Sequence, residues 1–197
     1  MRRSSTAQRD AKRTMIVAAA SEVMRTQGVA ACSARAIADA SPLTKSALHY
    51  YFADVDEIMH LAFRSLMEQF VGRIEKDART AASPVDALWA AARTYLRLGA
   101  DRPGGTRVPL LWFDYQVTAA RHGETAVARE FTDRTVQLFT DLVTATEVDT
   151  AAARASALVS ALIGTIVRTA MDPRPLDLTL AELAESLGLP APTCEQR

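Results

Sequence analysis

The stretch from Ser33 to Phe52 constrains the fold of this 197-residue chain more than any other. The Ser33 hydroxyl can accept a hydrogen bond from an amide in the first turn of a short helix, and small and apolar residues, Ile37 among them, follow at helical spacing. Pro42 ends this helix, because proline disfavours the α conformation in the residue before it. Thr44 can then cap a second helix. The stretch is therefore predicted to be two short helices joined by a tight turn.

The second of these helices is predicted to be amphipathic. Its inner side would carry Ala47, Leu48 and Tyr51, and its outer side would carry Lys45, Ser46, His49 and Tyr50. Two short helices around such a turn are typical of a DNA-binding helix-turn-helix, whose second helix enters the major groove. Lysine, serine and histidine side chains can all bond to base edges. We therefore expect this outer side to contact bases, and Thr44 and Arg35 to contact phosphates.

The same stretch resembles the DNA-binding segment of the tetracycline-repressor (TetR) family of bacterial regulators. The resemblance covers roughly residues 11–57 and includes an upstream helix that ends at Gly28. The residues that carry it are Ile37-Ala38, Leu43-Thr44-Lys45, Leu48 and Tyr51-Phe52.

Four positions depart from the usual pattern of that family. Pro42 replaces a turn glycine, Ser46 replaces a common glycine at the start of the recognition helix, His49 replaces a frequent tyrosine, and Val55 replaces a phosphate-contacting lysine. These changes leave the helical framework unaffected. Pro42, Ser46 and Val55 leave open an alternative in which the helix-turn-helix has lost specific DNA binding.

The rest of the chain is predicted to be all-α, because no segment alternates apolar and polar residues with a period of two. We expect an N-terminal helix-turn-helix domain over residues 1–53, a helical effector-binding and dimerisation domain over 54–187, and a flexible tail over 188–197. The expected helices are 11–27, a long one from 54 to about 80, then 84–99, 108–121, 124–146, 150–171 and 178–187. The arm before residue 11, with Arg2, Arg3 and Arg9, could enter the minor groove or remain a solvated tail.

Charge is distributed unevenly, although the whole chain has a formal net charge of zero. Residues 1–56 hold eight basic and five acidic residues, a net +3, which leaves −3 for the remainder. A basic end on a mildly acidic body fits a small DNA-binding domain attached to a larger one.

The two cysteines, Cys32 and Cys194, are far apart in sequence, so we expect no structural disulfide and predict that Cys32 is a buried packing residue. The three histidines are scattered, and no spacing predicts a metal site. The sequence has no phosphate-binding glycine loop, nucleophile elbow or metalloprotease motif. We therefore predict that the chain is not an enzyme and needs no cofactor, and that carboxylates such as Asp114 are structural.

A group of aromatic residues marks the predicted second domain. Large side chains on three helices could line a cavity for a largely apolar small molecule, or they could form an ordinary packed core, which spacing alone favours. The resemblance to TetR-type regulators favours the cavity, because that family often holds an effector among these helices. The residues expected to bind the effector are Phe70, Trp89, Arg93, Trp112, Phe113 and Gln116; Tyr95, Tyr115 and His122 are their neighbours.

The last two long helices, about 124–146 and 150–171, are expected to form a homodimer interface. The second is rich in alanine and serine and contains Gly164, so another helix can approach it closely. Within a monomer the same face would be core. A two-fold partner is the interpretation we prefer, since the family resemblance implies one and since two half-sites on DNA require one.

Together these features predict a DNA-binding regulator, most simply a repressor that a small effector releases from operator DNA. Effector binding would shift the long helix that begins at Asp54 and so change the spacing of the two recognition helices. The alternative is a helical small-molecule-binding or interaction protein. We expect a cytoplasmic protein, because the N-terminus lacks the apolar stretch of a secretory signal and no apolar run approaches the roughly 20 residues that span a bilayer.

Overall fold

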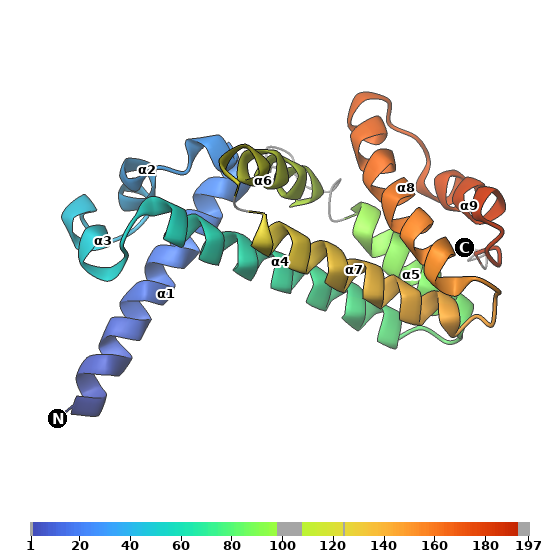
Figure 1. Ribbon diagram of the computed structural model, residues 1–197, viewed down its shortest axis with the longest axis horizontal. Coiled ribbons are helices and arrows are strands. Elements are labelled where there is room, and N and C mark those ends of the chain that lie inside the picture. The colour runs from blue at the N-terminus through green and yellow to red at the C-terminus, as the bar shows by residue number, and fades with distance from the viewer. Residues whose placement is uncertain (1, 98–107, 124, 193–197) are drawn as a thin grey trace. The chain divides into compact units, whose positions relative to one another are not determined.

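The computed structural model describes residues 2–97, 108–123 and 125–192, and within them helices joined by short turns and no strands occur, as the predicted all-α fold requires (Figure 1). The order of the helices agrees with the sequence prediction. Their bounds are α1 Arg2–Gln27, the 3-10 helix η1 Val29–Ala31, α2 Ala34–Asp39, α3 Lys45–Tyr51, α4 Val55–Arg79, α5 Pro84–Arg97, α6 Val108–His122, α7 Ala126–Thr144, α8 Ala151–Met171 and α9 Leu176–Leu187.

Contacts divide the chain into two compact units. Unit 1 combines residues 1–68 with 102–127, and unit 2 combines residues 69–101 with 128–197. Helix α4 therefore contributes its first part to unit 1 and its last part to unit 2. Helix α6, which the sequence groups with the second domain, belongs by its contacts to the same unit as the helix-turn-helix.

Helix α1 is the central element of unit 1, where it packs against η1, α2, α3 and α6. Its buried residues include Ile16, Ala20 and Met24, each of which has no exposed surface. Gly28 follows with φ 88°, a conformation that glycine adopts without steric cost, and its amide donates to the Met24 carbonyl at 3.0 Å. The predicted end of this helix is confirmed.

The start of α1 differs from the prediction, because the helix begins at Arg2 and not near residue 11. Residues 2–10 contain no proline or glycine, so nothing interrupts the helix before its first apolar residue. The sequence prediction began the helix where apolar periodicity begins. The basic N-terminal segment is thus a polar extension of α1 and not an extended arm.

Cys32 is buried between η1 and α2, with 7% of its surface exposed, as the sequence predicted. Burial raises the pKa of its thiol to about 11, because a thiolate loses its hydration there. The thiol therefore stays protonated at neutral pH. Cys194 lies outside the described residues.

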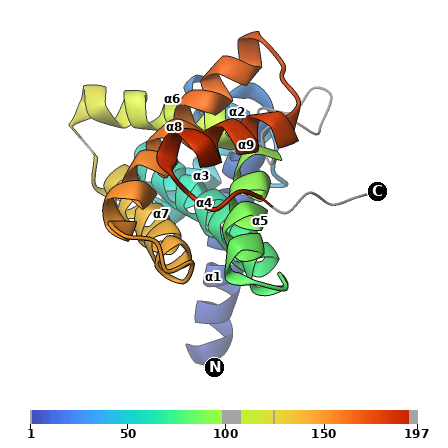
Figure 2. The same cartoon turned by 90° about the vertical axis from the view of Figure 1, so that its right-hand side faces the viewer.

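Unit 2 is built on α5, α8 and α9, which pack against one another (Figure 2). The apolar side of α5 is buried, as are Leu158 and Leu162 of α8 and Leu180 of α9. The Trp89 indole N–H donates to the Pro190 carbonyl at 2.7 Å, so the segment after α9 is held against α5.

Helix α8 corrects one expectation. Within the described residues, Ala151–Thr169 is long and apolar enough to cross a membrane by length and composition alone, although 33% of it is buried. The expectation that no apolar run approaches this length is therefore wrong. The composition has a local cause, because one face of α8 supplies large core residues such as Leu158 and the other carries mostly small ones.

Candidate nucleic-acid interface

Side-chain caps begin both short helices of the candidate interface. The Ser33 Oγ accepts a hydrogen bond from the Ala36 amide at 3.2 Å, and the Thr44 Oγ1 accepts one from the Ala47 amide at 3.3 Å. Each bond caps the first turn of its helix, where the amides lack the usual acceptor four residues earlier. Between the helices, the Ser41 Oγ accepts from the Leu43 amide at 3.2 Å and shapes the turn around Pro42.

Buried apolar residues attach these helices to the rest of unit 1. Ile37, Leu48 and Phe52 are 0%, 2% and 4% exposed, and Tyr51 is half-buried. Because the apolar side of α3 faces inward, its other side faces solvent. The orientation expected from the sequence is confirmed.

The exposed side of α3 carries the residues predicted to contact bases, Lys45, Ser46, His49 and Tyr50. Tyr50 is 74% exposed, and its ring meets that of Tyr51 edge-on at 5.0 Å between centroids. Thr44, the cap of the helix, is also exposed. Four polar side chains of different hydrogen-bonding capacity thus lie next to one another on one short helix. Their roles at DNA remain predictions.

Arg35 projects from α2, with 89% of its side chain exposed. Its only ion pair within the described residues is with Asp39, one turn along the same helix, at 3.9 Å. An exposed pair at this distance contributes little. The guanidinium is therefore exposed, and its contact with a phosphate stays a prediction.

Arg13 of α1 has a role that the sequence did not reveal. Its guanidinium donates to the Tyr51 carbonyl at the end of α3, donates to Glu57 Oε1 at 2.7 Å, and lies 4.0 Å from the centre of the Phe52 ring. The Glu57 Oε2 accepts from the Ala53 amide at 3.0 Å. We call these four interactions the Arg13 contacts; they join α1, the end of α3 and the start of α4.

The Arg13 contacts lower the pKa of Glu57 below its ordinary value of 4.5. The hydrogen bond from Arg13 is the main cause, and the bond from the Ala53 amide adds to it. Both bonds favour the charged carboxylate. In the sequence, Arg13 is recognisable only as part of the positive charge of residues 1–56, because its partner Glu57 lies 44 residues away.

Asp114 links α6 to the helix-turn-helix region. Its Oδ2 accepts a hydrogen bond from the Val29 amide of η1 at 3.1 Å. That amide lies in the first turn of η1, where the helix itself offers no acceptor. The prediction that Asp114 is a structural carboxylate is supported by this bond.

The residues predicted to bind an effector are divided between the two units. In unit 2, Phe70 and Tyr95 are buried, with ring centroids 5.2 Å apart, and Tyr95 meets Phe139 at 6.2 Å. Trp89 is also buried, and Arg93 forms an ion pair with Asp177 of α9.

The other predicted effector residues belong to α6 in unit 1. Trp112 and Gln116 are half-buried, whereas 46% of Phe113 is exposed. Tyr115 is buried and stacks on Phe63 of α4, with 3.6 Å between ring centroids. The side chain of His122 lies outside the described part of the chain.

A cleft in unit 2 includes two of the predicted effector residues, Trp89 and Arg93. Its volume is about 580 Å³, and it lies along the end of α4 and one side of α5. Charged groups line it as well, among them Asp77, Asp86 and Arg97. Such walls suit an amphipathic molecule better than a wholly apolar one.

The residues that the structure describes contain no cluster of three or more histidine, cysteine, aspartate or glutamate side chains that could hold a metal ion. In the cleft, the Thr94 hydroxyl donates a hydrogen bond to Asp77 Oδ2 at 2.8 Å. The chemistry of both sites is that of hydrogen bonding and charge.

Comparison with known proteins supports the resemblance found in the sequence. Residues 16–61 match the family described as bacterial regulatory proteins, tetR family. A comparison with curated proteins finds no significant match.

Solved structures share the fold over most of the chain. A transcriptional regulator from Rhodococcus sp. Rha1 is 22% identical with a TM-score of 0.74, and covers 89% of this chain and 94% of its own. A TetR-family regulator from Cytophaga hutchinsonii is 15% identical with a TM-score of 0.76, over 92% and 95% of the two chains. The multidrug binding protein EbrR, solved with imidazole, is 27% identical with a TM-score of 0.66, over 93% and 92%. The fold is that of TetR-family regulators.

Proposed function

We propose that this chain, whose N-terminal segment belongs to the tetR family of bacterial regulatory proteins, is a transcriptional regulator that binds operator DNA through α3. The observation that carries the proposal is the outer side of α3. Lys45, Ser46, His49 and Tyr50 are exposed there together, on a helix that Leu48 holds to the core. Thr44 and Arg35 are exposed as well, and they would contact phosphates beside this helix.

The regulator acts as a homodimer in this proposal, with α8 at the centre of the interface and α7 beside it. The exposed residues of α8 are mostly small or apolar, including Ala153, Ala157 and Gly164. Those of α7 are mostly polar or charged, including Asp133 and Gln137. The apolar area that an interface needs at its centre therefore falls on α8. A two-fold dimer places two recognition helices on half-sites about 34 Å apart.

A small effector would bind in unit 2, near Phe70, Trp89 and Arg93, with Trp112, Phe113 and Gln116 of α6 as the other candidates. The cleft beside Trp89 and Arg93 has room for a molecule of drug size. The multidrug binding protein EbrR, which has the same fold, gives a precedent for small-molecule binding. The protein would repress without effector and leave the DNA when effector binds, if effector and operator favour different dimer geometries. Such coupling must be reciprocal.

The proposal assigns no catalytic activity to the chain and no cofactor. It assigns the protein to the cytoplasm, where its operator DNA would be.

The experiment that tests DNA binding is a titration of the dimer with its own upstream DNA, labelled for anisotropy, over a series of salt concentrations. Sequence-specific binding that weakens steeply with salt supports the proposal, because phosphate contacts release counterions. Equal affinity for a scrambled duplex at low salt contradicts it. That result favours a helical small-molecule-binding or interaction protein, in which Pro42, Ser46 and Val55 have removed specific recognition.

The effector is tested by adding candidate ligands to the complex with operator DNA. A ligand that lowers the affinity for DNA by some factor must itself bind the DNA-bound dimer more weakly than the free dimer by that same factor. The genes that lie beside this one suggest which ligands to try first, since regulators of this kind often control their neighbours.

A further inference from the structure

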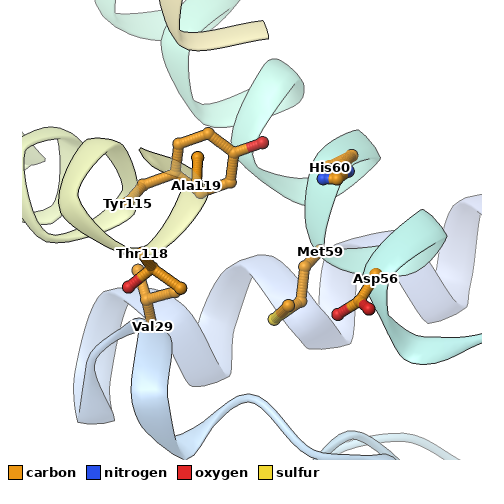
Figure 3. A pocket seen from close by; sticks show the side chains of 7 residues that line it. All are labelled: Val29, Asp56, Met59, His60, Tyr115, Thr118 and Ala119. Carbon is orange, nitrogen blue, oxygen red and sulfur yellow. The ribbon is translucent and has the colours of Figure 1, made fainter. Parts of the chain in front are cut away.

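Unit 1 contains a cavity of its own, distinct from the cleft beside Trp89. Its volume is about 200 Å³, and it lies among η1, the first turns of α4 and the last turns of α6 (Figure 3). For comparison, an apolar cavity of about 150 Å³ is large enough to bind benzene. The space therefore admits a small organic molecule of that size.

The inner wall of this cavity is mostly apolar. Val29, Tyr115 and Ala119 are 2%, 3% and 6% exposed, and the thioether of Met59 extends toward Val29 (Figure 3). Thr118 adds a hydroxyl to this lining. A flat hydrocarbon group would replace water against these residues with a gain in free energy.

The α4 side of the cavity is polar and acidic. Asp56 and His60 lie one turn apart on α4, and the Asp56 side chain is exposed at the edge of the cavity. Three acidic residues lie at the start of this helix, and two of them have partners. Asp54 caps α4 by accepting from the Glu57 amide at 2.7 Å, and Glu57 binds Arg13.

Asp56 is the third, and within the described residues its carboxylate forms no hydrogen bond or ion pair. An unpaired carboxylate at the edge of a partly enclosed cavity attracts a cation more strongly than one in open solvent, because the local dielectric constant is lower. An anionic ligand is disfavoured for the same reason.

We propose that this cavity is a binding site for small organic cations. The charged group would pair with Asp56 at the edge, and an apolar ring would lie against Val29, Met59 and Ala119. A metal ion fits less well, because the lining offers one carboxylate and one imidazole, fewer than the ligands of a closed site. A bound cation would touch both η1 and α6, the two segments that the Asp114 hydrogen bond to Val29 already joins.

The test uses the full-length protein without DNA, so it does not depend on the proposed regulatory function. The probe is benzylammonium, and benzyl alcohol is the neutral control of matched shape. Binding is followed by calorimetry and by amide shifts in two-dimensional NMR. We expect benzylammonium to bind with a dissociation constant of roughly 1 mM, reasonable for eight non-hydrogen atoms, and benzyl alcohol to bind about tenfold more weakly. The shifted amides should include Val29 and Thr118.

Two variants locate the site. Asp56→Asn keeps the shape of the side chain and should weaken benzylammonium about tenfold while leaving benzyl alcohol unchanged. Glu68→Gln, an exposed carboxylate farther along α4, is the matched control and should bind as the wild type does. Ala119→Leu fills the cavity and should abolish binding of both probes.

Three results would overturn the proposal: equal affinity for the charged and neutral probes, unchanged affinity in Asp56→Asn, or no binding of benzylammonium up to about 20 mM. Circular dichroism checks that Ala119→Leu is folded. If it is not, Asp56→Asn alone decides, because the Asp56 side chain is exposed and forms no hydrogen bond or ion pair within the described residues.

Discussion

The outer faces of α3 and α8 are both exposed, but their side chains differ in kind. The exposed face of α3 presents a lysine, a serine, a histidine and a tyrosine within six residues. That of α8 presents mainly alanine, serine and glycine, with Val167 36% and Met171 78% exposed near its end. Varied hydrogen-bonding groups suit base edges, whereas small residues suit a second helix at close range. Exposure alone therefore does not define a partner; the chemistry of the exposed groups does.

The largest expected effect tests the α8 face. A Cβ at Gly164 would meet no atom within 4 Å, so Gly164→Leu is accommodated within the chain itself. Against a partner helix the added side chain prevents close approach, and we expect dimerisation to weaken about 100-fold. Sedimentation over a concentration series measures it. Gly72→Leu is the control, because a Cβ at Gly72 also meets no atom within 4 Å. If Gly164→Leu dimerises with the same dissociation constant as the wild type, α8 is not at the interface.

The second effect tests whether the position of α3 matters as much as its residues. Arg13→Ala removes the three Arg13 contacts that the guanidinium itself makes, and we expect a loss of about 2 kcal/mol in the free energy of unfolding because Glu57 and the Tyr51 carbonyl lose a charged donor. Urea denaturation measures this loss. Arg9→Ala, one turn earlier on an exposed part of α1, should change stability by less than about 0.5 kcal/mol.

Operator binding by the same two variants distinguishes the effect of the position of α3 from the effect of losing one positive charge. We expect Arg13→Ala to weaken binding more than Arg9→Ala does, although Arg13 is occupied by protein partners. Equal losses in both would mean that Arg13 acts only through its positive charge.

The third effect tests the α3 face residue by residue. Lys45→Ala and His49→Ala should each weaken operator binding about tenfold, within the 1–3 kcal/mol that a good base contact contributes. Stability and dimerisation should not change, since both side chains are exposed. Lys76→Ala on the exposed side of α4 is the control for a general charge effect. Wild-type affinity in both α3 variants would rule out this face as the base-contacting surface.

The smallest effect is a pH dependence at Glu57. Because its pKa is lower in the folded state than its ordinary value of 4.5, the folded state favours the ionised form. The resulting stabilisation is fully present above pH 4.5 and is lost as the pH falls through the lowered value. The difference in stability between the wild type and Glu57→Gln should therefore shrink with acidification below pH 4.5. A difference that stays constant from pH 6 to pH 2.5 would contradict this.

The sequence predicted those features that arise within one segment. The spacing of Ile37 and Leu48, the caps Ser33 and Thr44 and the end of α1 at Gly28 are all local, and all are confirmed. What it missed depends on distant partners. Arg13 meets Glu57 across 44 residues, and no local pattern marks an arginine that binds a backbone carbonyl in another helix.

The aromatic group shows the same limit. Phe70, Trp89, Trp112 and Phe113 share a residue type and helical spacing, which alone favour a packed core, and only the resemblance to TetR-type regulators grouped them around one cavity. The contacts distribute them over two units, and Phe113 is 46% exposed. Aromatic side chains serve as core, as pocket lining and as surface, so residue type does not distinguish these roles without knowledge of which helices meet.

The hydrogen bond between Trp89 and the Pro190 carbonyl has a spectroscopic consequence. The chain has two tryptophans, Trp89 in unit 2 and Trp112 in unit 1. Trp89 is buried and Trp112 is half-buried, so their emission maxima should differ. In two separate variants, Trp112→Phe keeps only Trp89 and so reports on unit 2, whereas Trp89→Phe keeps only Trp112 and so reports on unit 1. The two melting curves then show whether this protein unfolds in one cooperative step or in two.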